Sequence, residues 1–298
     1  MPDRTVLIGD GGLATELEAR GNDLSGGLWS ARLLVTAPHE IAAVHAAYFR
    51  AGAVIATTAS YQASFEGFAA QGIGRDEAVR LLRRSVQLAQ SAREEVGATG
   101  RWVAASVGPY GAVLADGSEY RGRYGLSVTA LMKWHRPRLE VLAGAGADVL
   151  ALETLPDVDE AEALVELVRQ VGVPAWLCYT ITGTRTRAGQ PLAEAFAVAA
   201  GVPEIVAVGV NCCAPNDVLP AIGVAQAVSA KPVIVYPNSG EHWDARRRTW
   251  TGASRLSPTL VSRWVSAGAR IIGGCCRVGP ADIAALAAAV NSAPPPAA

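Results

Sequence analysis

The amino-acid sequence predicts a single (β/α)8 barrel, also called a TIM barrel, and three observations lead to this prediction. Short apolar runs rich in β-branched residues alternate along the chain with longer amphipathic stretches of helical period. Near-continuous apolar strands joined by helices are typical of a parallel sheet whose outer face is covered. Eight such units in 298 residues match this barrel in both number and length.

The eight predicted strands begin with TVLIGD and end with IIGGCC. In chain order they are residues 5–10, 54–59, 102–108, 149–154, 175–180, 205–212, 232–238 and 271–276. Apolar stripes opposite charged faces predict helices over residues 39–52, 75–95 and 157–172. The rival interpretation is a doubly wound sheet. Such sheets rarely have eight strands, and no GxGxxG follows the first strand, where GDGGLATELEARG stands instead.

Composition restricts the domain organisation and the partners. We expect one barrel domain over residues 1–291 and a disordered tail over residues 292–298, because the end of the chain is rich in proline and alanine. The net charge is −1 with both signs interspersed, which argues against nucleic acid and anionic lipid as partners. No apolar leader and no run of membrane-spanning length is present. We therefore expect a cytoplasmic protein with small-molecule substrates, either a monomer or a small homo-oligomer.

Polar and reactive residues gather where the predicted strands end, which is where active sites of this fold lie. Candidate substrate-binding residues at these strand ends are Asp10, Gly11, Gly12, Thr58, Glu153, Asn238 and Ser239. Four of the five cysteines, Cys212, Cys213, Cys275 and Cys276, lie at the same predicted rim. The strands that carry them are distant in sequence but meet across the barrel mouth.

Three of these cysteines suit a zinc ion. Cys212, Cys275 and Cys276 would supply three thiolates and leave the fourth position open, as catalytic zinc requires. The adjacent pair can reach one ion only if the strand has ended or kinks at its glycine pair. Cys213 should face away from Cys212, and Cys178 is interpreted as a buried apolar residue. Burial as small apolar side chains is the alternative for the whole set, and His242 is a possible fourth ligand.

Several stretches together carry a family resemblance: GDGGLATELEARG, TTASYQAS, ETLPDVDEAEAL, VGVNC, VYPNSGEHWD and GGCCRVGP. They resemble, in order and over residues 10–280, the homocysteine S-methyltransferase family of zinc barrels. The resemblance implies methyl transfer from S-methylmethionine or S-adenosylmethionine to homocysteine, with Cys212, Cys275 and Cys276 as the zinc ligands. One segment departs from the family. After the fifth strand the family tends to have an acidic Asp-Gly turn, whereas this chain has the basic TGTRTRAGQPL.

The chemistry of homocysteine suggests roles for the rim. Glu153 is expected to receive the ammonium, and amides of the Gly11–Gly12 turn could meet the carboxylate. Asp10 either positions that turn, faces the ammonium or caps a helix. An ion pair with an arginine is the structural alternative for Glu153. Asn238 and Ser239 either bind substrate or shape their loop.

Aromatic residues in the rim loops could hold a sulfonium by cation–π attraction or pack ordinarily. They are Tyr61, Tyr110, Trp243 and Trp250. The long glycine-rich segment over residues 108–125 is typical of a substrate-covering loop. Alternatives to homocysteine methylation are methylation of selenohomocysteine or another thiol, zinc-dependent hydrolysis on the same barrel, and non-catalytic zinc binding or redox sensing.

Overall fold

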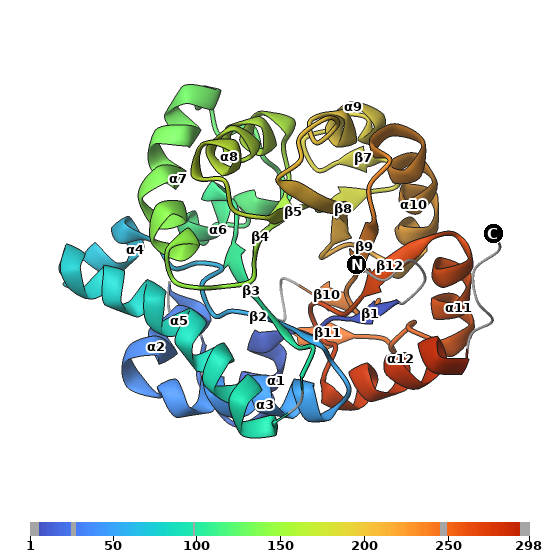
Figure 1. Ribbon diagram of the computed structural model, residues 1–298, viewed down its shortest axis with the longest axis horizontal. Coiled ribbons are helices and arrows are strands. Elements are labelled where there is room, and N and C mark those ends of the chain that lie inside the picture. Colours follow the sequence, from blue (N-terminus) through green and yellow to red (C-terminus); the bar gives the residue numbers. More distant parts are fainter. Residues whose placement is uncertain (1–5, 25–27, 98, 245–248, 293–298) are drawn as a thin grey trace.

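A ring of eight parallel strands occupies the centre of the chain in a computed structural model that describes residues 6–24, 28–97, 99–244 and 249–292 (Figure 1). The strands are β1 (Leu7–Ile8), β2 (Ile55–Thr57), β3 (Trp102–Val107), β4 (Val149–Leu155), β5 (Ala175–Tyr179), β8 (Ile205–Asn211), β9 (Val233–Tyr236) and β12 (Ala269–Ile272). Their order is β1-β12-β9-β8-β5-β4-β3-β2. The ring closes where Gly9 and Ile55 form a parallel bridge between β1 and β2. The prediction of a (β/α)8 barrel and of its eight strands is confirmed.

Helices surround the ring on its outer side (Figure 1). The longer ones are α3 (Pro38–Arg50), α5 (Arg75–Val96), α7 (Val128–Ala143), α8 (Val158–Val171), α10 (Pro215–Ser229), α11 (Pro258–Ser266) and α12 (Pro280–Ser292). Shorter segments are α1 (Leu13–Ala19), η1 (Trp29–Arg32), α2 (Leu33–Thr36), α4 (Phe65–Ala69), α6 (Tyr110–Leu114), η2 (Ser118–Tyr120) and α9 (Leu192–Ala197). The three helices predicted from amphipathic periodicity are α3, α5 and α8, each within two residues of its expected limits.

Local sequence explains where several of these helices begin and end. The side chains of Ser127 and Ser257 accept hydrogen bonds from backbone amides in the first turns of α7 and α11. Asp157 does the same at the start of α8. Gly97 and Gly172 end α5 and α8 in the left-handed conformation that glycine adopts without steric cost.

The core has two layers. Inside the ring, Trp176 and Tyr236 pack with aliphatic side chains, and the Trp176 indole N–H donates to the Tyr236 hydroxyl at 3.1 Å. Cys178 is fully buried in this inner layer, as its interpretation as an apolar residue requires. A larger layer lies between the strands and the helices. The strands themselves are closely packed: a Cβ at Gly209 would lie 1.7 Å from the Ile234 carbonyl oxygen, so only glycine fits there.

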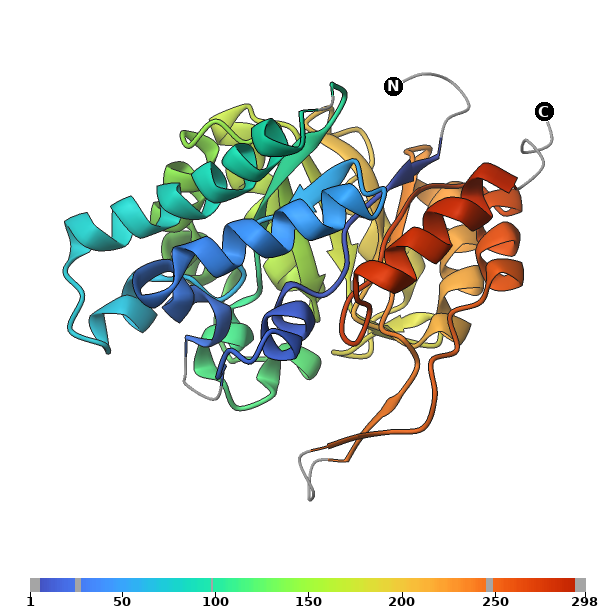
Figure 2. The ribbon, with the colours of Figure 1, turned by 90° about the horizontal axis from the view of Figure 1, so that it is seen from below.

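Two antiparallel hairpins interrupt the regular alternation and were not predicted. One pairs β6 (Ile181–Thr182) with β7 (Arg185–Thr186), and the other pairs β10 (His242–Asp244) with β11 (Thr249–Thr251). Figure 2 shows the second hairpin projecting far from the barrel. Both follow a barrel strand and therefore belong to the face on which active sites of this fold lie.

Helix α12 extends to Ser292, and residues 293–298 of the expected tail lie outside the described part of the chain. Among the described helices, none is long and apolar enough to cross a membrane.

Candidate metal centre and substrate site

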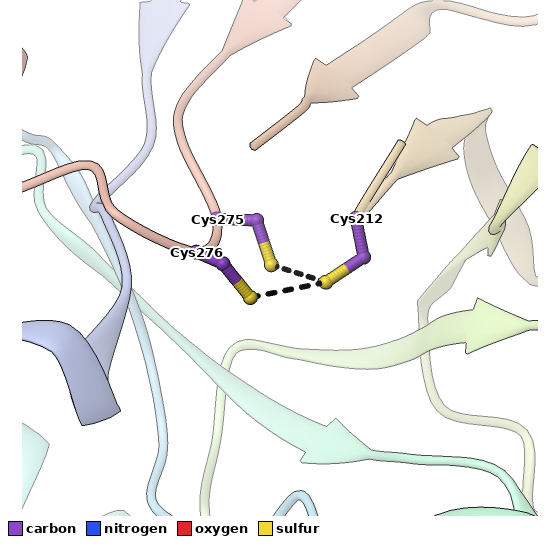
Figure 3. Close-up of side chains that lie close together, drawn as sticks. All are labelled: Cys212, Cys275 and Cys276. Carbon is purple, nitrogen blue, oxygen red and sulfur yellow. Dashed lines mark hydrogen bonds between the residues drawn. The ribbon is translucent and has the colours of Figure 1, made fainter. Parts of the chain in front are cut away.

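Three thiols meet at the end of the barrel where β8 and β12 finish (Figure 3). Cys212 follows β8 directly, and Cys275 and Cys276 lie in the turn after β12. The Cys212 sulfur is 2.7 Å from the Cys275 sulfur and 3.7 Å from the Cys276 sulfur. All three sulfur atoms lie within 4.8 Å of one another. The structure thus brings together the three cysteines that the sequence singled out.

The turn after β12 explains how two neighbouring cysteines reach one point. Strand β12 ends at Ile272, so the alternation of strand side chains no longer applies to the pair. The Gly274 amide donates to the Asp10 carbonyl at 2.9 Å, and the Cys275 amide donates to the Pro237 carbonyl at 2.8 Å. A Cβ at Gly274 would lie 2.1 Å from the Val278 side chain. This turn therefore requires glycine next to the thiols because of close packing.

Two residues with positive φ lie at the neighbouring strand ends. Cys212 has φ 49°, and Thr154, at the end of β4, has φ 59° although it is β-branched. Asn211 stabilises the second of these with two bonds of 2.7 Å: its side-chain oxygen accepts from the Thr154 amide, and its side-chain nitrogen donates to the Thr154 hydroxyl. Unusual backbone conformations that the surroundings enforce are frequent at functional sites. Neither Thr154 nor Asn211 was among the predicted site residues.

Asn238 and Ser239 support the cysteine turn from the loop after β9. The Asn238 amide donates to the Cys213 carbonyl at 3.0 Å, and its side-chain oxygen accepts from the Cys276 amide at 3.1 Å. The Ser239 amide donates to the Cys276 carbonyl at 3.0 Å. These two residues thereby connect the two cysteine segments. The sequence allowed either substrate binding or shaping of the loop for these two residues, and the observed bonds favour shaping of the loop.

The Gly11–Gly12 turn packs against the same cysteine turn from the other side. The Gly12 amide donates to the Val278 carbonyl at 2.9 Å, and a Cβ at Gly12 would lie 2.6 Å from the Cys275 carbonyl oxygen. The buried Tyr48 hydroxyl lies 2.9 Å from the Gly12 carbonyl and 3.0 Å from the Val278 carbonyl. Within the described residues the Gly11 amide has no hydrogen-bond partner, so it is the amide of this turn that a ligand can still use.

The donor set fits a tetrahedral metal ion. With metal–sulfur bonds of about 2.3 Å, neighbouring sulfur atoms in such a site lie about 3.8 Å apart. The separation of Cys212 from Cys276 already matches this value, and Cys275 would move by about 1 Å to match it. Hydrogen bonds from Cys212 and Cys275 hold the pKa of Cys276 well below its usual range. Hydrogen bonds with Cys212 and Cys276 raise the pKa of Cys275 well above its usual value. A bound cation would let all three thiols ionise.

Glu153 lies at the end of β4, on the barrel side of the thiols, and is 7% exposed. The Ser106 hydroxyl donates to its carboxylate. Burial raises the pKa of Glu153 to about 7, against the opposing effect of hydrogen bonds from Ser106 and Tyr236. Among the described residues no arginine or lysine pairs with this carboxylate. The alternative role for Glu153, an ion pair with an arginine, is therefore not observed within them.

Asp10 links the first two strands. Its carboxylate accepts from the Thr57 amide at 2.6 Å and from the Thr57 hydroxyl at 3.0 Å. Burial raises the pKa of Asp10 to about 8 despite these bonds. Thr58 is also buried, and its hydroxyl lies 2.7 Å from the Ser60 hydroxyl and accepts from the Ser106 amide at 3.1 Å. Thr58 therefore contributes to the hydrogen bonding around Ser106, the residue that donates to Glu153.

Tyr120 is a residue of the site that the sequence did not single out. It lies in η2, within the glycine-rich segment after β3, and its hydroxyl is 3.7 Å from the Cys212 sulfur. The segment itself was recognised as a covering loop, but the approach of one tyrosine to a thiol depends on how that loop folds. The loop is therefore adjacent to the metal centre in this structure.

Two buried carboxylates of α8 hold this loop at both of its ends. Glu160 accepts from the Tyr110 amide at 2.6 Å and lies 2.8 Å from His135 Nε2. Asp157 accepts from the Arg123 amide at 2.9 Å and from the Gln190 side chain at 2.5 Å. Asp157 therefore joins the loop after β3 to the turn after β7.

Of the remaining predicted residues, Tyr61 is near the thiols, since burial and the neighbouring Cys212 raise its pKa, whereas the others are not in the cluster or lie outside the described residues. Tyr110 packs edge to face against Tyr124 and Trp134, with ring centres 5.2 and 5.0 Å apart. Cys213 is fully buried in the outer core layer and is not part of the thiol cluster. Tyr61 contacts Gly108 at the base of the loop after β3. The side chains of His242, Trp243 and Trp250 lie outside the described residues.

Comparison with known proteins gives consistent matches over the whole barrel. A family model described as homocysteine S-methyltransferase matches residues 7–290. The homocysteine S-methyltransferase of Escherichia coli (strain K12) is 48% identical over 293 residues, which cover 95% of this chain and 94% of the relative. Homocysteine S-methyltransferase YbgG of Bacillus subtilis (strain 168) is 43% identical over 304 residues, covering 96% and 95% of the two chains.

A solved structure matches the barrel as well. The metallated form of the homocysteine methyltransferase MmuM from Escherichia coli superposes with a TM-score of 0.87 at 46% identity, and the match covers 96% of each chain. The apo form of MmuM superposes with a TM-score of 0.77 at 40% identity, covering 96% of this chain and 97% of that one.

Proposed function

Because the chain belongs to the homocysteine S-methyltransferase family, we propose that it transfers a methyl group from a sulfonium donor to homocysteine bound at a zinc ion on Cys212, Cys275 and Cys276. The chain is a methyltransferase enzyme that acts on homocysteine. The observation that carries the proposal is the cluster of three thiols within 4.8 Å at the barrel mouth. S-methylmethionine and S-adenosylmethionine are the candidate donors.

Zinc is the metal that this donor set favours. Three soft sulfur ligands select zinc over hard cations such as magnesium or calcium, which prefer oxygen. Three protein ligands also leave one tetrahedral position for a substrate. When bound, zinc would act as a Lewis acid that keeps the homocysteine thiol deprotonated at neutral pH. The related MmuM has a metallated form, which supports metal binding by this chain.

The reaction needs positioning more than acid–base chemistry. The homocysteine sulfur forms a bond to the methyl carbon while the bond from that carbon to the donor sulfur breaks, and the thiol proton of homocysteine passes to solvent. Glu153, as a carboxylate, receives the substrate ammonium. The Gly11 amide would meet the carboxylate, and the observed bonds of Asp10 and Gly12 support this role because they hold the turn that carries it. Orientation of this kind lowers the barrier because the two sulfur atoms and the methyl carbon are held in line.

Hydrolysis by a zinc-bound water is less well supported. Zinc hydrolases usually combine histidine and carboxylate ligands, whereas the described part of this chain offers only the three-cysteine cluster. The acceptor could also be selenohomocysteine, whose selenium would occupy the same position as the homocysteine sulfur. Competition between the two acceptors in one assay would measure the preference.

The proposal is tested by metal content and methionine formation. Single replacement of Cys212, Cys275 or Cys276 by Ala should remove most zinc and activity, since two thiolates hold the ion poorly. Replacement of Cys178 or Cys213 by Ala is the matched control and should leave zinc content unchanged. The protein is incubated with homocysteine and each donor in turn, and methionine is measured by mass. Full zinc occupancy in all three rim variants would refute the ligand assignment.

A further inference from the structure

Arg187 brings a positive charge close to the metal centre. It lies in the basic turn between β7 and α9, where the sequence departs from the family pattern. Its guanidinium carbon is 5.7 Å from the centre of the Tyr120 ring. The hydroxyl of that same ring is 3.7 Å from the Cys212 sulfur. A single tyrosine side chain therefore separates this guanidinium from the thiol cluster.

Arg187 has no carboxylate partner among the described residues, in contrast to Arg277 and Arg123. Arg277 pairs with Glu241 at 3.2 Å, and Arg123 lies 3.8 Å from Asp157. Arg187 forms no ion pair with any residue that the structure describes, and its buried Nε has no hydrogen-bond partner among them. A buried donor without an acceptor is unfavourable. The arrangement is suited to an acceptor that a ligand supplies.

The charges of the centre indicate which ligand group that is. Two carboxylates, Glu153 and Glu119, are close enough to Cys212 to interact with it electrostatically, and their charge suits the sulfonium and ammonium groups of the substrates. They do not suit a carboxylate. Both candidate donors carry a carboxylate as well as a sulfonium, and guanidinium binds carboxylate well because two N–H groups can pair with its two oxygens.

We propose that Arg187 binds the carboxylate of the methyl donor, a role that rests on the proposed function. In this proposal the homocysteine sulfur binds the metal, and its ammonium and carboxylate groups face Glu153 and the Gly11 amide. The donor then approaches from outside, past Tyr120. Arg187 is then a residue that selects donors derived from amino acids over simple sulfonium ions.

The test compares two donors in the zinc-loaded protein. S-methylmethionine carries a carboxylate, and trimethylsulfonium does not. Arg187→Gln should raise KM for S-methylmethionine about tenfold, the loss expected for one charge-assisted bond. The same variant should leave kcat/KM for trimethylsulfonium and KM for homocysteine unchanged, and Arg187→Lys should recover part of the loss. Arg185→Gln is the control, because it removes the same charge from an exposed position in the adjoining strand β7.

Calorimetric titration with S-methylmethionine measures the same discrimination without turnover. Equal affinity of the parent and Arg187→Gln would overturn the proposal. An equal loss with both donors would also overturn it, because it would mean that Arg187 only holds Tyr120 in place. A rise in KM for homocysteine would assign the guanidinium to the other substrate. If the parent transfers no methyl group from either donor, the proposed function fails instead, and the titration still decides whether Arg187 binds a carboxylate.

Discussion

Glu153 shows how a single buried carboxylate can recognise a substrate. It accepts a hydrogen bond from Ser106 and has no cationic partner among the described residues. An ammonium group can therefore serve as the missing counter-charge. A buried carboxylate without such a partner destabilises the folded state, which is reflected in the raised pKa of about 7. Substrate recognition and protein stability have opposite requirements at this residue.

The Glu153→Gln variant should therefore lose activity while its metal content stays the same. Loss of a charge-assisted bond costs about 1.5 to 3 kcal/mol, so kcat/KM for homocysteine should fall at least tenfold. Because burial raises the pKa of Glu153 to about 7, the difference between parent and variant should grow as the pH rises through this value. Slow methylation of an alkanethiol without an amino group serves as the control. If the variant loses activity equally toward both thiols, Glu153 does not bind the ammonium.

A second prediction concerns Asp10 and the pH dependence of the free energy of unfolding. Its pKa is about 8 in the folded protein and 3.8 without the influence of the fold. Between these values the folded state retains a proton that the unfolded state has released, so the free energy of unfolding falls as the pH rises through this window. Asp10→Asn can keep both contacts with Thr57 and should show a flatter pH dependence. Urea unfolding of parent and variant at about pH 5 and about pH 8.5 measures the difference. Identical slopes would contradict the raised pKa.

At the scale of elements, the first turn of α8 fixes the loop after β3. Asp157 and Glu160 hold opposite ends of the segment that carries Tyr120. The stretch DVDEAEAL is part of the family resemblance of the sequence. In the structure its residues Asp157 and Glu160 hold the loop after β3 by hydrogen bonds. A helix of the outer layer thereby determines the position of a side chain at the metal centre.

Asp157→Ala should loosen this loop without removing the metal. The variant loses the acceptor for the Arg123 amide and the Gln190 side chain, as well as the cap of α8, so we expect about a tenfold fall in kcat/KM. Amide hydrogen exchange at Arg123 should become faster, while zinc content stays constant. Asp157→Asn retains one acceptor oxygen and should restore part of both properties. Unchanged exchange at Arg123 in the Ala variant would show that other contacts hold the loop.

The sequence predicted the barrel well because its strands are buried on both faces and read as uninterrupted apolar runs. The hairpin β6–β7 was missed because its strands have two residues each and lie in the mostly polar ITGTRT stretch, without alternation. The three thiols were found because their strand ends meet at one rim. Tyr120 was not found, since its distance from Cys212 depends on the course of an irregular loop.

The observed roles of glycine could not be read from the sequence either. The Gly11–Gly12 turn was expected to present amides to a substrate, and Gly12 instead uses its amide to bind the Val278 carbonyl. What excludes a side chain there is the Cys275 carbonyl oxygen, 2.6 Å from where a Cβ would be. Contacts of this kind involve residues more than 260 positions apart. They form only when the ring closes and brings the first and last strands together.

At the scale of the whole molecule, the metal should stabilise the closed barrel. The proposed ligands follow the ends of β8 and β12, which both pair with β9, so a bound ion would tie three adjacent strands together. A ligand that binds only the folded state adds about 2.7 kcal/mol when its free concentration is a hundredfold above Kd. Removal of zinc with a chelator should therefore lower Tm by several degrees, and added zinc should restore it. The Cys212→Ala variant should show no response to chelator.

The separation of the ligands along the chain also determines when during synthesis the enzyme can receive its metal. Cys212 and Cys275 are 63 residues apart, and the second of them follows the last strand of the ring. A nascent chain that has emerged from the ribosome only as far as α10 offers one ligand thiolate, which holds zinc poorly. With the proposed ligands, zinc would therefore be acquired only after the last strand of the ring has been made. The zinc supply of the cell would then set the fraction of finished enzyme that is active.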